Sequence, residues 1–315
     1  MSARTGPNLA GWAWLSIAAA ITTIALKSSA YLLTGSVALL SDALESVVNL
    51  VAAVLALIAI RIASRPADET HPFGHGKVEY FSAGAEGLMI LVAAILIIVS
   101  AVQRLLSPQQ LDDLGIGLVV TLVATAVNLV VGVLVLRAGS RHRSITLVAD
   151  GKHLLTDVWT SVGVVIGVGL VAITGWLPLD SLVAIAVALN ILWTGWGLVG
   201  HSTRGLMDHA MPPADVESVR RVLSSVAGEY PSGEVDFHAL QTRESGRERF
   251  VSMHVLVPGS WTVAEGHDLL EILEQRVRQA LPGAHVHTHL EPSDDPRSYE
   301  DGTGGFSAGA GSTSA

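Results

Sequence analysis

Six long apolar stretches in the first two thirds of the chain are the feature that most constrains its fold. A helix needs about 20 mostly apolar residues to cross a bilayer, and the stretches that qualify are residues 10–33, 37–60, 81–105, 115–136, 147–174 and 182–199. Only 15% of the residues are charged, against about 25% in soluble globular proteins. The first stretch is too long for the core of a signal peptide. The sequence therefore predicts a polytopic α-helical membrane protein with six transmembrane helices in residues 9–204.

Basic residues predict how these spans are oriented. Six of them lie in the connections after the second and fourth stretches: Arg61, Arg65, Lys77, Arg137, Arg141 and Arg143. The opposite connections hold three acids and one base: Asp112, Asp113, Asp180 and Arg104. Because positively charged short loops stay on the cytoplasmic side, we expect residues 1–8 and the C-terminal part to be cytoplasmic. The protein is expected in the cell (inner or plasma) membrane.

The last third of the chain has a different composition. Residues 1–204 carry 11 acids and 11 bases, whereas residues 205–315 carry 17 acids and 8 bases, so the net charge of −9 belongs to this part. A nucleic-acid partner would require a basic face, whereas an acidic module suits a cation.

Periodicity predicts helices at residues 213–229 and 264–281 and strands at 234–242, 250–257 and 284–290. The order αββαβ indicates a small ferredoxin-like or metallochaperone-like α+β domain over residues 205–292. The Gly/Ser/Asp-rich residues 293–315 are expected to be a disordered tail.

Ionisable residues inside the fifth stretch are the first candidate site. Such residues are costly in a membrane unless they are paired or functional. Asp150, His153 and Asp157 are spaced so that they share one stripe of a helix. Imidazole and carboxylate ligands suit divalent ions such as zinc, iron or manganese. The alternative is a structural role, either a hydrogen bond between His153 and Asp157 or a polar contact between helices.

The second stretch offers a matching set. Asp42, Glu45 and Asn49 fall on one helix face, and two such stripes facing each other would supply four or more oxygen and nitrogen ligands. An isolated Asn49 would more often be a helix-packing amide. The chain has no cysteine, so thiolate metal sites are excluded.

Two further groups lie outside the spans. In the loop at residues 61–77, Asp68, His71 and His75 fall within eight positions and can wrap one ion, although two nearby loop histidines are often incidental. The C-terminal domain is unusually rich in candidate ligands: His238, His254, His267, His285, His287, His289 and Glu291. The alternating positions of the last three histidines place them on one face of a strand.

Glu86 in the third stretch has two interpretations. It is either an acid on a proton path or a polar contact at a subunit interface.

Three motifs resemble the cation diffusion facilitator family, and in particular its bacterial zinc/iron exporters. They are Thr34-Gly35-Ser36-Val37, the run from His71 to Lys77 (HPFGHGK), and Asp150-x-x-His153-x-x-x-Asp157. The resemblance covers residues 10 to 292, with six spans and the αββαβ module in the same order. It implies a non-enzymatic homodimer that exports divalent metal ions in exchange for protons by alternating access.

The resemblance also implies the ligand sets. The transport site would consist of Glu45, Asn49, His153 and Asp157, with Asp42 as a possible helper. The loop site would use Asp68, His71 and His75. The cytoplasmic site would use His238, His254, His267, His289 and Glu291, with His285 and His287 as possible additions. The resemblance further implies an ion pair between Lys77 and Asp208 at the dimer hinge.

One departure from the family concerns the cargo. The family usually presents Asp or His, then Asp, where this chain has Glu45 and Asn49. Zinc is the first expectation for both the substrate and the regulatory ligand, with Fe²⁺, Mn²⁺, Cd²⁺ and Co²⁺ as alternatives. An intramembrane metalloenzyme is a rival function, but the chain has no H-E-x-x-H motif. A metal-gated channel or sensor is another.

Overall fold

The computed structural model describes residues 9–34, 37–106 and 115–299. The expected cytoplasmic N-terminus at residues 1–8, Gly35 and Ser36 of the first motif, and residues 300–315 of the expected tail lie outside the described residues. The chain divides into two compact units, residues 1–206 and 207–315, and each is described separately below.

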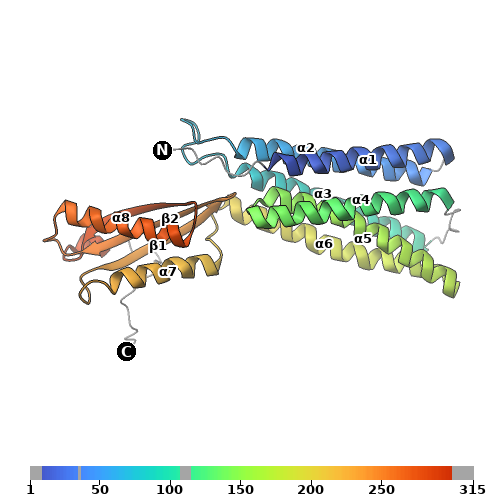
Figure 1. The fold of residues 1–315 in the computed structure, drawn as a ribbon. Helices are drawn as coiled ribbons and strands as arrows, with labels where there is room; N and C mark the ends of the chain where they lie inside the picture. Colours follow the sequence, from blue (N-terminus) through green and yellow to red (C-terminus); the bar gives the residue numbers. More distant parts are fainter. Residues whose placement is uncertain (1–8, 35–36, 107–114, 300–315) are drawn as a thin grey trace, which may run out of the picture. The chain divides into compact units, whose positions relative to one another are not determined.

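The first unit contains the six expected spans. They run side by side along one common direction (Figure 1) and comprise α1 (Ala10–Thr34), α2 (Val37–Ala63), α3 (Val78–Leu106), α4 (Gly115–His142), α5 (Ile145–Thr174) and α6 (Pro178–Leu206). All six are long and apolar enough to cross a membrane. Several helices extend past the apolar stretch that predicts them, because polar residues at their ends continue the helical hydrogen bonding outside the apolar run.

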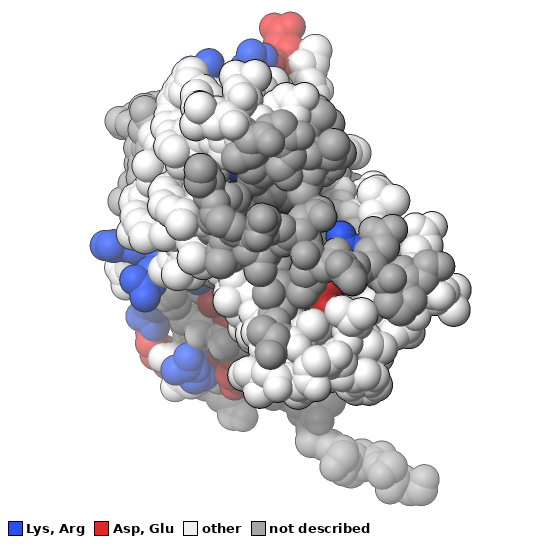
Figure 2. Space-filling model, turned by 90° about the vertical axis from the view of Figure 1, so that its right-hand side faces the viewer, with Lys and Arg blue, Asp and Glu red and all other residues white. Residues whose placement is uncertain are grey.

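The outer surface of this unit is strongly apolar. Leu32, Ile173 and Trp193 are 80%, 84% and 81% exposed, which would be unfavourable over so large an area in water. In the view of Figure 2, Lys, Arg, Asp and Glu occupy only small parts of the described surface. The first unit is therefore that of a multi-pass membrane protein, with these side chains facing lipid.

Two glycines allow α4 and α5 to approach closely. A Cβ added to Gly139 would lie 2.7 Å from the backbone nitrogen of Val148, and one added to Gly151 would lie 2.7 Å from that of Leu136. Small residues at such crossings let two backbones pack directly in a membrane. The contact fixes the position of α5, which carries His153 and Asp157, against α4.

The second unit has the predicted αββαβ order. Its elements are α7 (Pro213–Ala227), β1 (Asp236–Ser245), β2 (Glu248–Val257), α8 (Val263–Ala280), β3 (Ala284–Pro292) and the 3₁₀ helix η1 (Pro296–Tyr299). The sheet order is β1-β2-β3, with β1 and β2 antiparallel and β2 and β3 parallel.

One face of the sheet holds the core of this unit. Val251, Met253 and Val255 of β2 are buried against Leu223 of α7 and Leu273 of α8. Side chains alternate across a strand, so the neighbouring residues of β2, among them His254, belong to the opposite face. Both helices thus cover one face of the sheet, and the histidines lie on the opposite face.

Residues 293–299 differ from the expected disordered tail. The hydroxyl of Ser298 donates to the carbonyl of Pro292 at 2.7 Å, and the hydroxyl of Tyr299 donates to the carbonyl of Ser293 at 3.1 Å. Ser298 is only 5% exposed. These hydrogen bonds close a turn at residues 293–299, although the polar composition of the segment predicts disorder.

Candidate metal-binding sites

The polar stripes of α2 and α5 meet inside the first unit. Asn49 and His153 are 5% and 6% exposed. The side-chain carbonyl of Asn49 lies 2.7 Å from Nε2 of His153, and the amide of Asn49 donates to Asp157. One amide therefore connects both predicted ligands of α5.

This arrangement is an interhelical polar contact between α2 and α5. His153 bonds to Asn49 rather than to Asp157, so the expected alternative of a structural His153–Asp157 bond is not what forms. If Nε2 carries the ring proton that Asn49 accepts, a neutral imidazole keeps its free lone pair on Nδ1. That Nδ1 is buried and makes no hydrogen bond among the described residues. An imidazole nitrogen with a free lone pair is a suitable donor for a divalent cation.

Asn128 is a neighbour of this site that the motif reasoning missed. It lies on α4, is 4% exposed, and donates from Nδ2 to Oδ2 of Asp157 at 3.3 Å. The signal in the sequence was available, since an amide inside an apolar span needs a partner. An asparagine has neither a charge nor an imidazole, so its residue type alone does not predict a metal site.

The other residues of the two stripes lie differently. Glu45 is exposed on α2, one turn before Asn49. The side chain of Asp42 lies outside the described part of the structure. Asp150 is 2% exposed and accepts a hydrogen bond from Ser16 of α1 at 2.5 Å, so it is tied to another helix.

The loop between α2 and α3 does bring its three candidates together. His71 Nδ1 and His75 Nε2 each lie 3.4 Å from the carboxylate of Asp68, and the two imidazole rings are 4.3 Å apart. Ligand atoms of all three fall within 4.8 Å of one another. Gly74, with φ of 78°, supplies the left-handed turn that folds this loop.

Hydrogen bonds hold Asp68 in its ionised form. Its carboxylate accepts from the hydroxyl and the backbone N–H of Thr70 and from the backbone N–H of His71. The hydroxyl bond from Thr70 is the largest influence that lowers the pKa of Asp68 from 3.8 to about 2. A carboxylate is therefore ready for a cation at every physiological pH.

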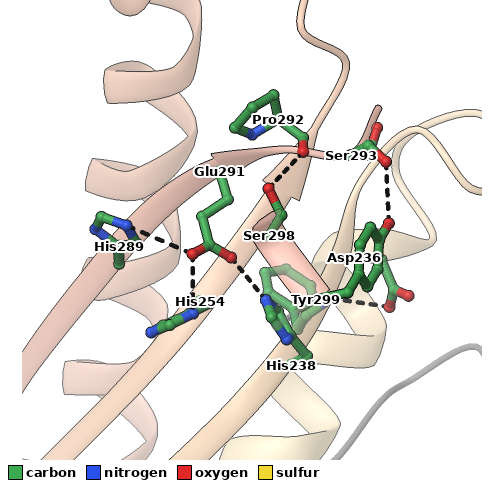
Figure 3. A network of polar contacts seen from close by, with 10 residues as sticks. Asp236, His238, His254, His289, Glu291, Pro292, Ser293, Ser298 and Tyr299 are labelled. Atoms are coloured by element: carbon green, nitrogen blue, oxygen red, sulfur yellow. Dashed lines mark hydrogen bonds and ion pairs between the residues drawn. The ribbon is translucent and has the colours of Figure 1, made fainter. Parts of the chain in front are cut away.

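A third cluster lies on the histidine-bearing face of the cytoplasmic sheet (Figure 3). His238, His254 and His289 occupy one row across β1, β2 and β3. The carboxylate of Glu291 lies 2.8, 3.2 and 3.5 Å from them respectively. Glu291 is 8% exposed, so one buried carboxylate is surrounded by three imidazoles from three strands.

The remaining histidine candidates lie away from this cluster. His267 is an exposed residue of α8, and α8 packs on the opposite face of the sheet. His285 stacks on Phe250, with ring centroids 4.8 Å apart, and His287 pairs with Ser252 in the register. The structure thus groups four of the seven candidates.

Tyr299 is a neighbour of the third cluster that sequence reasoning placed in the disordered tail. Its ring centroid lies 6.1 Å from that of His238, and Figure 3 shows it beside the imidazole. The turn at residues 293–299, which follows β3 directly, thus places Tyr299 next to His238.

The expected Lys77–Asp208 pair would join the two units and stays a prediction. Within the first unit, Lys77 Nζ donates to the carbonyl of Leu206 at 3.4 Å. Within the second, Asp208 accepts from Arg243 at 3.1 Å.

Six apolar spans with ligand-type side chains between them, followed by an αββαβ domain, define the class of membrane transporters of metal cations. The family described as "Cation efflux transmembrane domain" matches residues 13–207, and "Cation efflux protein, cytoplasmic domain" matches residues 211–293. The chain belongs to the cation diffusion facilitator, or cation efflux, family.

Individual relatives agree with this assignment. "Uncharacterized transporter sll1263" of Synechocystis sp. is 51% identical over 289 residues, which are 92% of each chain. The "Cation-efflux pump FieF" of Salmonella arizonae is 29% identical over 275 residues, covering 87% of this chain and 90% of that protein. A solved structure titled "Mode of Action of a Putative Zinc Transporter CzrB" is 35% identical and covers 26% of this chain and 96% of its own, with a TM-score of 0.23.

Proposed function

We propose that this cation-efflux transporter exports divalent transition-metal ions from the cytoplasm in exchange for protons, by alternating access in a homodimer. Zinc is the proposed cargo, and iron(II), manganese, cobalt and cadmium share its ligand chemistry. The proposed location is the cell membrane, with both termini in the cytoplasm, because the Lys and Arg residues concentrate in the loops on that side.

The observation that carries the proposal is the hydrogen-bonded group formed by the buried Asn49 and His153 with the partly buried Asp157. Polar groups of this kind inside a span mark an ion path. Glu45 and Asp157 together would supply two negative charges, which balance a divalent cation. Asn49 and His153 would then complete a four-ligand set, the number that zinc prefers.

Proton exchange follows from the same ligands. A metal ion binds imidazole and carboxylate only when they are deprotonated, so protons and metal compete for the same lone pairs. A site open to the cytoplasm would take up the ion. The same site open to the other side would meet protons that displace it, and the inward proton gradient would then drive export.

The clusters outside the membrane are proposed to be regulatory. A metal ion at Glu291 and its three histidines would tie together the three strands of the acidic domain and bias the dimer toward transport. Asp68, His71 and His75 would form the loop site. Deletion of residues 212–315 is expected to weaken activation at low metal concentration without abolishing transport.

The test is metal-dependent proton flux in proteoliposomes. His153→Ala is expected to abolish it, whereas the exposed His201→Ala on α6 serves as a matched control. Unchanged flux in His153→Ala would refute the site. Metal flux that is indifferent to a pH gradient would indicate a channel instead of an exchanger.

A further inference from the structure

Three acids of the transmembrane unit are buried apart from the proposed metal ligands: Glu79, which accepts a hydrogen bond from Ser144, and Glu86 and Asp150. Glu86 on α3 is 0% exposed and Asp150 on α5 is 2% exposed. Ala149, the neighbour of Asp150 on α5, lies in one buried cluster with Ala83 and Ile90, the residues of α3 on either side of Glu86, and α3 packs against α5. A pair of acids on two packed helices is therefore enclosed within the bundle.

The hydrogen bonding of this pair is incomplete. Oε1 of Glu86 lies 3.5 Å from the hydroxyl of Ser82, while Oε2 is buried without a hydrogen bond among the described residues. Asp150 accepts from Ser16 at 2.5 Å. An ionised carboxylate accepts several hydrogen bonds, and here one oxygen of Glu86 has none.

Positive charge does not compensate the pair within the part of the chain that the structure describes. The neighbouring helices carry other titratable groups, but none of these makes an ion pair or hydrogen bond with Glu86 or Asp150. They are Lys27 and Tyr31 on α1, Glu45 and Arg61 on α2, Glu79, Tyr80 and Arg104 on α3 itself, Arg137, Arg141 and His142 on α4, Lys152, His153 and Asp157 on α5, and Asp180, His201 and Arg204 on α6.

Burial of two ionised carboxylates without a cation is strongly unfavourable. Each uncompensated charge costs several kcal/mol, and two like charges in one site disfavour each other's ionisation. The apolar side chains around α3, including Ala83 and Ile90, offer no compensation. A proton on one of the two carboxyl groups removes this cost.

The position of Asp150 connects this proton to the metal. Asp150 precedes His153 by three residues on α5, so the two side chains are neighbours on one helix face, with Cβ atoms roughly 5–6 Å apart. A divalent cation at His153 and Asp157 would stabilise the ionised form of the nearby pair. Binding of the metal and release of the proton are then linked, and the linkage acts equally in both directions.

We propose that Glu86 and Asp150 form a proton-binding carboxyl pair, separate from the metal ligands, that releases a proton when a divalent cation binds at His153 and Asp157. This inference rests on the proposed exchange function. The pair stores the proton in the metal-free state, and the proton leaves to water on the side to which the site is open. Exchange then does not depend on the metal ligands alone.

The experiment measures protons released when Zn²⁺ binds to the purified full-length protein, with a pH indicator and with infrared difference spectroscopy. In the wild type, Zn²⁺ is expected to remove the carbonyl band of a protonated carboxyl group. Glu86→Gln is expected to lack this loss and to release up to one proton fewer per bound ion. Glu217→Gln is the control, because it removes an exposed acid of α7 and leaves both buried acids in place.

Asp150→Asn provides a second variant in case Glu86→Gln does not fold. The inference is overturned if a folded variant of either acid keeps the Zn²⁺-induced band loss and the wild-type proton count. Failure of the wild type to exchange Zn²⁺ for protons in proteoliposomes would instead refute the proposed function. If the wild type exchanges Zn²⁺ for protons and the Glu86 and Asp150 variants release as many protons as the wild type, only the carboxyl pair is refuted.

Discussion

Ser144 donates a hydrogen bond to the buried carboxylate of Glu79, with 2.5 Å between Ser144 Oγ and Glu79 Oε2. The same hydroxyl accepts from the backbone N–H of Leu147 and thereby caps the start of α5. Thr146 adds a bond of 3.3 Å to the carbonyl of Glu79. The first turn of α3 is thus fastened to the first turn of α5, two turns ahead of His153.

We expect Ser144→Ala to destabilise the transmembrane unit. The substitution removes a helix cap and one partner of a buried acid, and such losses cost about 1–3 kcal/mol. The measurement is the thermal unfolding midpoint of the detergent-purified protein. Ser144→Thr keeps the hydroxyl and should retain most of the stability. An unchanged midpoint for Ser144→Ala would show that the contact is not stabilising.

Asn49→Asp tests whether the amide sets the cargo. An aspartate here would place a second negative charge against Asp157, so divalent cations should bind at least about tenfold tighter, equivalent to about 1.4 kcal/mol. Protons should also compete more strongly, which makes the pH dependence steeper. A competition assay among transported ions measures both effects, with Gln275→Glu, an added charge at an exposed position of α8, as control. Equal affinity and equal ion preference would contradict the prediction.

Asn128→Leu tests the neighbour that supports Asp157. The 3.3 Å bond from its amide orients that carboxylate, and loss of such a supporting contact typically weakens a metal site 10–100-fold. Zn²⁺ titration of the purified protein gives the change in affinity. Asn190→Leu, on an exposed face of α6, controls for loss of an amide elsewhere in the bundle. Matching affinities for the two variants would remove Asn128 from the site.

The loop site has a defined pH dependence. Because the pKa of Asp68 is lowered to about 2, the stabilisation from its hydrogen bonds is present above its unfolded value and is lost only as pH falls through about 2. Metal binding at the loop between about pH 5 and pH 8 is therefore not limited by protonation of Asp68. Asp68→Asn should weaken binding across this range by a constant factor. Glu69→Gln, the exposed neighbouring acid, should have no effect, and a pH-dependent loss in Asp68→Asn would contradict the assignment.

Glu291→Gln should weaken metal binding by the cytoplasmic domain at least tenfold, since the carboxylate is the group shared by His238, His254 and His289. Metal titration of the full-length protein measures it, with the loop site disabled by His75→Ala in both samples. His285→Ala is the matched control, because that ring stacks on Phe250 instead of joining the cluster. A larger loss for His285→Ala than for Glu291→Gln would reverse the assignment.

Much of the architecture was readable from the sequence. Span length and apolar content predict α1 to α6, and alternation and helical period predict the order αββαβ, because both signals depend only on neighbours along the chain. The turn at residues 293–299 is not predicted by these signals. Ser298 and Tyr299 are held by hydrogen bonds that the amino-acid composition does not reveal.

The grouping of side chains was decided by the tertiary structure. The sequence alone identifies His153, Asp157 and Asn49 as candidates, because polar groups inside a span are costly unless they are paired or functional. Only the packing of α2 and α4 on α5 shows that one amide joins His153 to Asp157 and that Asn128 assists. Likewise, seven candidate ligands were evident in the cytoplasmic domain, but strand register selected four of them. Periodicity fixes which residues share a face, whereas contacts between elements depend on how those faces pack.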